Sequence, residues 1–209
     1  DAIDDTGVTV AEDGSVTIPV LPNDTDIDGD ALSVTHVNGT AITDGGAPVS
    51  VANGSVQLVA GELVFTPTAN YNGPLTFTYT ITDSNGGSDT ANVTGTVTSV
   101  NDGPDAIDDI GVTVAEDGSV TIPVLPNDTD IDGDSLSVTH VNGTAITDGG
   151  APVSVANGSV QLVAGELVFT PDAHYNGPLT FTYTITDGNG GSDTANVTGT
   201  VTPVNDGPD

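Results

Sequence analysis

The chain has 209 residues, among them 30 Asp and Glu but no Lys or Arg, so its formal net charge is −30. Without Lys or Arg it cannot neutralise phosphates, which excludes a nucleic-acid-binding function. The absence of cysteine excludes disulfides and cysteine-ligated zinc. No apolar run approaches the roughly 18 residues of a membrane-spanning helix, so we expect no direct membrane insertion.

The sequence consists of two nearly identical copies, because residues 1–104 and 105–208 differ at six positions. These are Thr6/Ile110, Ala31/Ser135, Thr68/Asp172, Asn70/His174, Ser84/Gly188 and Ser99/Pro203. A copy of this length can bury its own core, so we expect two domains, residues 1–104 and 105–209. Asp209 begins a third copy. We therefore expect a monomeric fragment of a longer array, with neighbouring repeats of the same chain as its partners.

Alternating apolar and polar residues predict strands over 7–11, 15–21, 31–38, 55–60, 63–66, 75–82 and 90–98 in the first copy. The clearest alternation runs over 75–82, where Leu, Phe, Tyr and Ile alternate with Thr. Asn-Gly, Asp-Gly, Gly-Gly and Gly-Pro pairs between the runs predict turns. About seven short strands in about 100 residues are typical of an Ig-like β-sandwich. The predicted fold class is therefore all-β, with two such sandwiches in tandem.

Acidic residues gather in loops that the predicted strand directions bring to one end of each sandwich. The loop 23–30 carries four aspartates at alternate positions, and the loop 83–89 begins and ends with aspartate. Glu12 lies in a turn at the opposite end. The linker 100–105 contains Asn101, Asp102 and Asp105. We therefore expect the base of the first domain to face the acidic loops of the second.

These facing loops predict a calcium site. Carboxylates about 4 Å apart repel by roughly 1 kcal/mol in water, and a cation with 6–8 oxygen ligands reverses that energy. Ca²⁺ is favoured over Mg²⁺ because the ligands are many and lie irregularly on loops, and histidine is too scarce for a transition metal. The candidate ligands are Glu12, Asn101, Asp102, Asp105, Asp108, Asp128, Asp130, Asp132, Asp134, Asp187, Asp193, Asp24, Asp26, Asp28, Asp30, Asp83 and Asp89.

Two familiar calcium motifs do not fit this sequence. Asp24-x-Asp26-x-Asp28-Gly29 matches the first half of an EF-hand loop, but Thr35 stands at the twelfth position and no helix is predicted beside it. Gly86-Gly-Ser-Asp89 occurs once per copy, which argues against a β-roll of calcium-binding nonapeptides.

Four segments carry a resemblance to a known family. Asn-Asp-x-Asp-x-Asp-Gly-Asp, Phe-Thr-Pro-x-Ala-x-Tyr-Asn-Gly, Phe-Thr-Tyr-Thr-Ile-Thr-Asp-x-Asn-Gly-Gly-Ser-Asp and Val-Asn-Asp-Gly-Pro resemble the cadherin-like tandem repeats of giant bacterial adhesins of the RTX group. The resemblance covers both copies. It implies an extracellular extender exported by type I secretion, in which calcium stiffens a stalk that carries a terminal binding domain away from the cell.

Animal cadherins are a more distant parallel. Their junction ligands point to Glu12, Asn101, Asp102, Asp128, Asp130 and Asp187. The chain departs from the cadherin pattern in the linker, which has no Asp two residues before Asn101, and before strand 75–82, where Thr68-Ala-Asn-Tyr replaces an acidic motif. Fewer junction ions than the three of cadherins, or sites shifted towards the second domain, are therefore expected.

Catalysis finds little support, because no insertion builds a cleft and no histidine lies near a serine nucleophile. A second hypothesis is a glycan-binding or homophilic adhesion module. It would use exposed aromatic residues, and Tyr71 and Tyr175 are the tyrosines outside predicted strands. For both tyrosines, packing of the loop is the simpler interpretation.

His36 and His140 fall in phase with the apolar residues of their strand, so we interpret them as tolerated strand-end residues.

Overall fold

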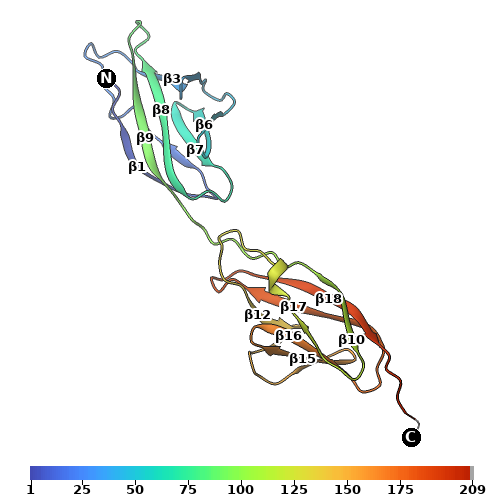
Figure 1. Cartoon of the computed structure of the whole chain (residues 1–209). Coiled ribbons are helices and arrows are strands. Elements are labelled where there is room, and N and C mark those ends of the chain that lie inside the picture. The colour runs from blue at the N-terminus through green and yellow to red at the C-terminus, as the bar shows by residue number, and fades with distance from the viewer. Residues whose placement is uncertain (208–209) are drawn as a thin grey trace. The chain divides into compact units, whose positions relative to one another are not determined.

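The computed structural model describes residues 1–207 and divides the chain into two compact units, Asp1–Val100 and a second that begins at Asn101. Each unit is an all-β, Ig-like sandwich of two sheets (Figure 1). Among the described residues no helix is long and apolar enough to cross a membrane.

The first unit pairs a five-stranded sheet with a four-stranded sheet. The five-stranded sheet has the order β1-β9-β8-β3-β4. Its strands are β1 (Asp5–Ala11), β9 (Ser88–Thr98), β8 (Gly73–Thr82), β3 (Ser33–Val37) and β4 (Thr40–Ala41). The four-stranded sheet has the order β2-β7-β6-β5. Its strands are β2 (Val16–Ile18), β7 (Glu62–Pro67), β6 (Gly54–Val59) and β5 (Val49–Val51).

The second unit repeats both sheets. One has the order β10-β18-β17-β12-β13, with β10 (Asp109–Ala115), β18 (Ser192–Thr202), β17 (Gly177–Thr186), β12 (Ser137–Val141) and β13 (Thr144–Ala145). The other has the order β11-β16-β15-β14, with β11 (Val120–Ile122), β16 (Glu166–Pro171), β15 (Gly158–Val163) and β14 (Val153–Val155). A 3₁₀ turn, η1 (Leu125–Asn127), follows β11.

The core of each unit follows the predicted alternation. Along β8, Leu75, Phe77, Tyr79 and Ile81 are all buried, while the threonines between them point outward. Phe77 stacks on Phe65 of the opposite sheet with ring centroids 6.1 Å apart. Each fully buried side chain of this kind stabilises the fold by about 1.5–3 kcal/mol, so β8 and β9 give the acidic loops a rigid support.

The first strand lies beside the last. β1 pairs parallel to β9, and β10 pairs parallel to β18 in the same way. Gly95 pairs with Val8, and a side chain at Gly95 would collide with the Val8 backbone, so glycine permits this close approach. This pairing brings the segment that precedes β1 alongside the loop between β8 and β9.

The strand prediction missed two short strands. Residues 39–54 were expected to be loop, but β4 and β5 lie within them because strands of two and three residues show no alternation. A signal for β4 is present in Asn38-Gly39. Both residues have positive φ (47° and 72°), as in the type I′ turn of a hairpin.

The predicted phase of strand 31–38 was wrong beyond Val34. The pairing of β3 with β8 shifts register between Val34 and His36, so that Val37, not His36, takes the next fully buried position. His36 is half-buried, and its Nδ1 lies 3.0 Å from Thr35 Oγ1. The structure gives His140 and Thr139 the same contact.

Candidate metal centre

The loop between β2 and β3 folds around the side chain of Asp26. Its Oδ1 accepts hydrogen bonds from the backbone N–H groups of Asp28 (2.9 Å) and Asp30 (3.0 Å). Gly29 supplies the left-handed turn inside this loop, with φ of 78°. In the second repeat Asp130 makes the same two bonds, at 3.0 and 3.1 Å. The aspartates at alternate positions therefore lie on one tight loop, which carries several carboxylates.

The loop between β8 and β9 closes around Asp83 in a similar way. Asp83 Oδ1 accepts hydrogen bonds from Asn85 N (2.7 Å) and Gly87 N (2.9 Å), and these bonds hold the pKa of this carboxyl below its ordinary value. Asn85 Nδ2 also donates to Asp30 Oδ2 (2.6 Å). This bond ties the two acidic loops to each other at one end of the sandwich.

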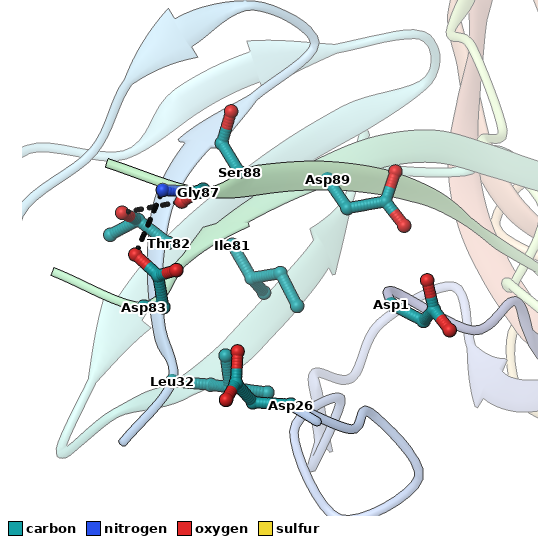
Figure 2. A pocket seen from close by; sticks show the side chains of 9 residues that line it. All are labelled: Asp1, Asp26, Leu32, Ile81, Thr82, Asp83, Gly87, Ser88 and Asp89. Carbon is teal, nitrogen blue, oxygen red and sulfur yellow. Dashed lines mark hydrogen bonds between the residues drawn. The ribbon is translucent and has the colours of Figure 1, made fainter. Parts of the chain in front are cut away.

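Each repeat has a cluster of three carboxylates, which comes from both loops in the first repeat and from one loop in the second. One oxygen from each of Asp26, Asp30 and Asp83 lies within 4.8 Å of the others. Asp26, Leu32 and Asp83 line one hollow, and Figure 2 shows Asp26 beside Leu32 and Asp83 above it. In the second repeat the carboxylates of Asp130, Asp132 and Asp134 converge within the same distance.

These groups fit a hard divalent cation. The donors are all oxygens, which Ca²⁺ and Mg²⁺ prefer, and no Lys or Arg is present to take the place of an ion. Asp130 Oδ2 is buried and has no hydrogen-bond partner among the described residues. A buried anionic oxygen without a donor is costly, and a bound cation removes that cost.

In the second repeat the linker joins the acidic loops directly. Asn101 Nδ2 donates to Asp187 Oδ2, and the Asp102 N–H donates to Asp132 Oδ2, both at 2.8 Å. The Asn101 bond is the main reason why the pKa of Asp187 lies below its ordinary value. Asp187 is only 5% exposed. The predicted ligands Asn101, Asp102, Asp132 and Asp187 therefore lie together.

Other predicted ligands hold the segment that precedes the first strand of each repeat. Asp89 accepts from Ala2 N (2.8 Å), and Asp193 accepts from Ala106 N (2.9 Å). Asp108 accepts from both the backbone and the side chain of Asn196. The structure thus gives these carboxylates a structural role as hydrogen-bond acceptors, and they lie outside the three-carboxylate groups found among the described residues.

A buried network that the sequence did not predict lies beneath the loops. The hydroxyl of Tyr79 lies 3.0 Å from both Ile3 O and Asp24 Oδ1, and Asp24 also accepts from Ile3 N (2.7 Å). Burial raises the pKa of Tyr79 and of the neighbouring Asp5. The alternation placed Tyr79 in the core, but it could not show that its hydroxyl reaches the predicted ligand Asp24.

The second repeat contains the same network. The Tyr183 hydroxyl lies 3.0 Å from Ile107 O and 3.1 Å from Asp128 Oδ1. Burial raises the pKa of Asp128 and Asp109 above the ordinary value. Asp105, which is exposed, is fastened by reciprocal backbone hydrogen bonds with Thr129.

Glu12 anchors the end of the last strand of its own repeat. It is 2% exposed, and its Oε1 accepts from Val100 N (2.6 Å). Glu116 makes the equivalent bond to Val204 N (2.7 Å). Glu12 Oε2 is buried and has no hydrogen-bond partner among the described residues. This oxygen is available to a cation.

Tyr71 and Tyr175 are fixed within their loops. Each hydroxyl donates to the carbonyl of a proline three residues later, Pro74 at 2.8 Å and Pro178 at 2.7 Å. Both rings are half-buried and pack against the core of their repeat. They pack the loop, as the simpler interpretation expected.

Comparison with known sequences identifies one family. The sequence profile of the bacterial Ig domain family matches residues 2–96 and 101–200, one match in each repeat. No curated protein sequence matches the chain.

Solved structures with a similar fold include two cadherins and a protocadherin. Drosophila N-cadherin EC1-4 is 15% identical, with a TM-score of 0.56, and the match covers 97% of this chain and 48% of that one. Mouse cadherin-23 EC22-24 is 17% identical, with a TM-score of 0.56 and coverages of 96% and 63%. Human mucin-like protocadherin EC1-2 is 19% identical, with a TM-score of 0.51 and coverages of 96% and 97%. At these identities the likeness shows the fold alone.

Proposed function

The chain belongs to the bacterial Ig domain family, and from this premise we propose that it is a calcium-stabilised extender, a spacer in a large secreted bacterial surface adhesin. The role is structural, not catalytic. Near-identical tandem repeats supply length, and each of these repeats has its own complete core.

The observation that carries this proposal is that a chain without Lys or Arg has two clusters of three carboxylates, one in each repeat. Asp26, Asp30 and Asp83 in the first repeat, and Asp130, Asp132 and Asp134 in the second, would hold the ions. Calcium would supply the positive charge that the chain lacks. The residues themselves fix the loops, because Asp26 and Asp130 hold the backbone of their loops before any ion binds.

We propose that Glu12, Asn101 and Asp102 act with the loop of the second repeat, so that calcium restrains bending between the repeats. Extracellular calcium modules bind with Kd of about 10⁻⁴–10⁻³ M. Calcium outside the cell would fill such sites, whereas the calcium-poor cytoplasm would not. The resemblance to RTX adhesin repeats supports export by type I secretion and a place on the bacterial surface.

X-ray scattering and thermal unfolding of the full chain, with calcium and with a chelator, test the proposal. We expect calcium to lengthen the average particle and raise the Tm. Asp130→Asn should reduce both effects. Asp172→Thr is the matched control, because it also removes one carboxylate and introduces the residue that the first repeat has at position 68. An unchanged radius of gyration and Tm on chelation would overturn the proposal.

A further inference from the structure

Each repeat contains four Asn-Gly pairs. They are Asn38-Gly39, Asn53-Gly54, Asn72-Gly73 and Asn85-Gly86, with Asn142-Gly143, Asn157-Gly158, Asn176-Gly177 and Asn189-Gly190 as their counterparts. An asparagine that precedes a glycine can lose its side-chain amide spontaneously, because glycine has no side chain to obstruct attack by its own backbone nitrogen. The reaction requires a backbone that can rotate, so the structure decides which of these pairs can react.

In each repeat two of the pairs run into a strand. Gly158 and Gly177 are the first residues of β15 and β17, and Gly54 and Gly73 begin β6 and β8 in the same way. Each of these glycines is paired with a residue of a neighbouring strand. The backbone cannot bring the glycine nitrogen to the preceding side chain without breaking this pairing, so these pairs are protected.

A third pair in each repeat forms a hairpin turn. Asn142 and Gly143 connect β12 to β13. Asn142 Oδ1 accepts hydrogen bonds from the backbone N–H and the hydroxyl of Thr182 (2.8 and 3.3 Å). Asn38 accepts the same two bonds from Thr78. The asparagine side chain is fastened to the sheet, so this pair is protected as well, although it is exposed.

The fourth pair lies in a loop. Asn189 and Gly190 are exposed and lie between β17 and β18, outside any strand. Gly188 and Gly191 flank them, and the φ angles of Gly188 and Gly190 are 80° and 120°. Glycine adopts such angles freely, so the backbone around Asn189 can rotate. The Gly190 N–H donates to Asp187 Oδ1 (3.0 Å), which places a proton acceptor beside the nitrogen.

We propose that Asn189-Gly190 is a site of spontaneous deamidation, and that Asn85-Gly86 is the corresponding site in the first repeat. The Gly190 nitrogen forms a bond to Cγ of Asn189, the bond between Cγ and Nδ2 breaks, and ammonia leaves with the proton that the nitrogen loses. Water then opens the resulting succinimide ring at one of its two carbonyl carbons, which gives aspartate or isoaspartate. Water is the only co-reactant.

The product adds a carboxylate to the cluster of Asp130, Asp132 and Asp134. Asn189 Nδ2 donates to Asp134 Oδ2 (2.7 Å), so deamidation replaces a hydrogen-bond donor by a negative oxygen at this position. Without a cation the two carboxylates repel each other. With calcium the new oxygen is a further ligand, and calcium affinity depends on the charge of the ligands. This consequence rests on the proposed function, whereas the deamidation does not.

Peptide mass spectrometry of the full chain after incubation at pH 8 in chelator tests the modification. Cleavage before aspartate separates the two loop sites, because the peptide with Asn85 contains Ser84 where the peptide with Asn189 contains Gly188. The conversion of an amide to an acid changes the mass of the peptide, so the rate at each site is measured directly. The same chain in concentrated urea is the control.

We expect the loop sites Asn85 and Asn189 to react at least about tenfold faster than the turn sites, because a turn asparagine must first break two hydrogen bonds. The turn sites are Asn38 and Asn142. In urea the rates at all four sites should become nearly equal, since the difference comes from the fold. Equal rates at loop and turn sites in the folded chain, or no reaction at the loop sites, would overturn the proposal.

A substitution tests the effect of the product on the cluster. Asn189→Asp introduces the new charge, and Asn157→Asp is the matched control, because it makes the same change at an exposed turn between β14 and β15. We expect Asn189→Asp to lower the Tm in chelator more than the control does. It should also tighten calcium binding about tenfold, which the control should not do.

The outcomes separate this proposal from the proposed function. Equal losses of Tm in the two variants would show that the new carboxylate does not reach Asp134. If neither variant nor the unmodified chain binds calcium, the proposed function is wrong, while the reaction rates and the Tm in chelator still decide whether the loop deamidates and repels Asp134.

Discussion

The acidic loops of the two repeats have the same sequence apart from Ser84 and Gly188, yet they differ in what covers them. In the second repeat the linker packs on the loops, and Asp187 is 5% exposed. In the first repeat Asp83 is half-buried and lines a hollow. Residues 101–104 are therefore a structural part of the repeat that follows them. Matched substitutions in the two repeats test this difference.

The largest expected effects are in the cores, where the repeats should behave alike. Phe65→Ala and Phe169→Ala each empty a site that is 1% exposed, so each should destabilise its own repeat by about 3–5 kcal/mol. Calorimetric unfolding of the full chain measures both. A clear difference between the two losses would show that the repeats differ in more than the cover of their loops.

The next effect distinguishes the covered loop from the open one. In Gly191→Ala the new methyl group collides with Gly103 and Pro104, which should destabilise the second repeat by about 1–3 kcal/mol. In Gly87→Ala the three atoms nearest to the new methyl group all belong to the side chain of Asp83, which can move, so the loss of stability should be smaller. Denaturant unfolding of both variants provides the test, and equal losses would mean that the linker does not pack as described.

A smaller effect concerns the linker amide. Asn101→Ala removes the donor to Asp187 and should destabilise the second repeat by about 1 kcal/mol. Asn205→Ala is the control, because the Asn205 side-chain amide donates to the backbone carbonyl of its neighbour Asp206. The pKa of Asp187 is lowered in the folded state, so its stabilisation exists above pH 3.8 and is lost as the pH falls.

Asn101→Ala should therefore flatten the acid limb of the stability curve, because the pKa of Asp187 then rises towards 3.8. Unfolding measured from pH 2 to pH 5, with Asn205→Ala in parallel, checks this. An acid limb that is the same in the two variants would argue against the Asn101 bond.

The smallest effects have opposite signs at two neighbouring aspartates. Burial raises the pKa of Asp109, so its folded form releases its proton at a higher pH than the unfolded chain does. Ionisation of Asp109 therefore lowers the stability of the fold as the pH rises above 3.8. Asp109→Asn should increase the free energy of unfolding of the metal-free protein at pH 7, by no more than about 0.5 kcal/mol. Asp108→Asn should destabilise it, because bonds from Asn196 lower the pKa of Asp108.

In the first repeat Asp5→Asn and Asp4→Asn should show the same pair of signs, since the pKa of Asp5 is raised and that of Asp4 lowered. Thermal unfolding at pH 7 in chelator gives all four values, and a stabilising Asp108→Asn would contradict the assignment.

Much of the fold could be predicted from the sequence, because alternation records which face of a strand is buried. Leu75, Phe77, Tyr79 and Ile81 were placed correctly on that basis. The alternation fails where register shifts, as at His36, and where a strand is as short as β4. Both the register shift and the short strand depend on the partner strand, and the residue pattern of one strand does not specify how its partner pairs with it.

The candidate site was predictable to a smaller extent. The predicted strand directions placed the loops of Asp26 and Asp83 at the same end of the sandwich. The hydrogen bond between Asn85 and Asp30 joins these two loops and confirms that prediction. The same reasoning could not separate the carboxylates that converge from those, such as Asp89, that accept bonds from the preceding segment. That division depends on backbone N–H groups, whose directions the sequence does not show.

Calorimetric titration of the metal-free chain with calcium, with magnesium as the comparison, tests directly whether the carboxylate clusters hold calcium. We expect calcium to bind with a Kd of about 10⁻⁴–10⁻³ M, and we expect Asp130→Asn to weaken this binding and Asp172→Thr to leave it unchanged. Each ion at about 100 times its Kd should stabilise the fold by about 2.7 kcal/mol. No calcium binding at about 10 mM, together with an unchanged Tm, would show that these carboxylate clusters are not calcium sites.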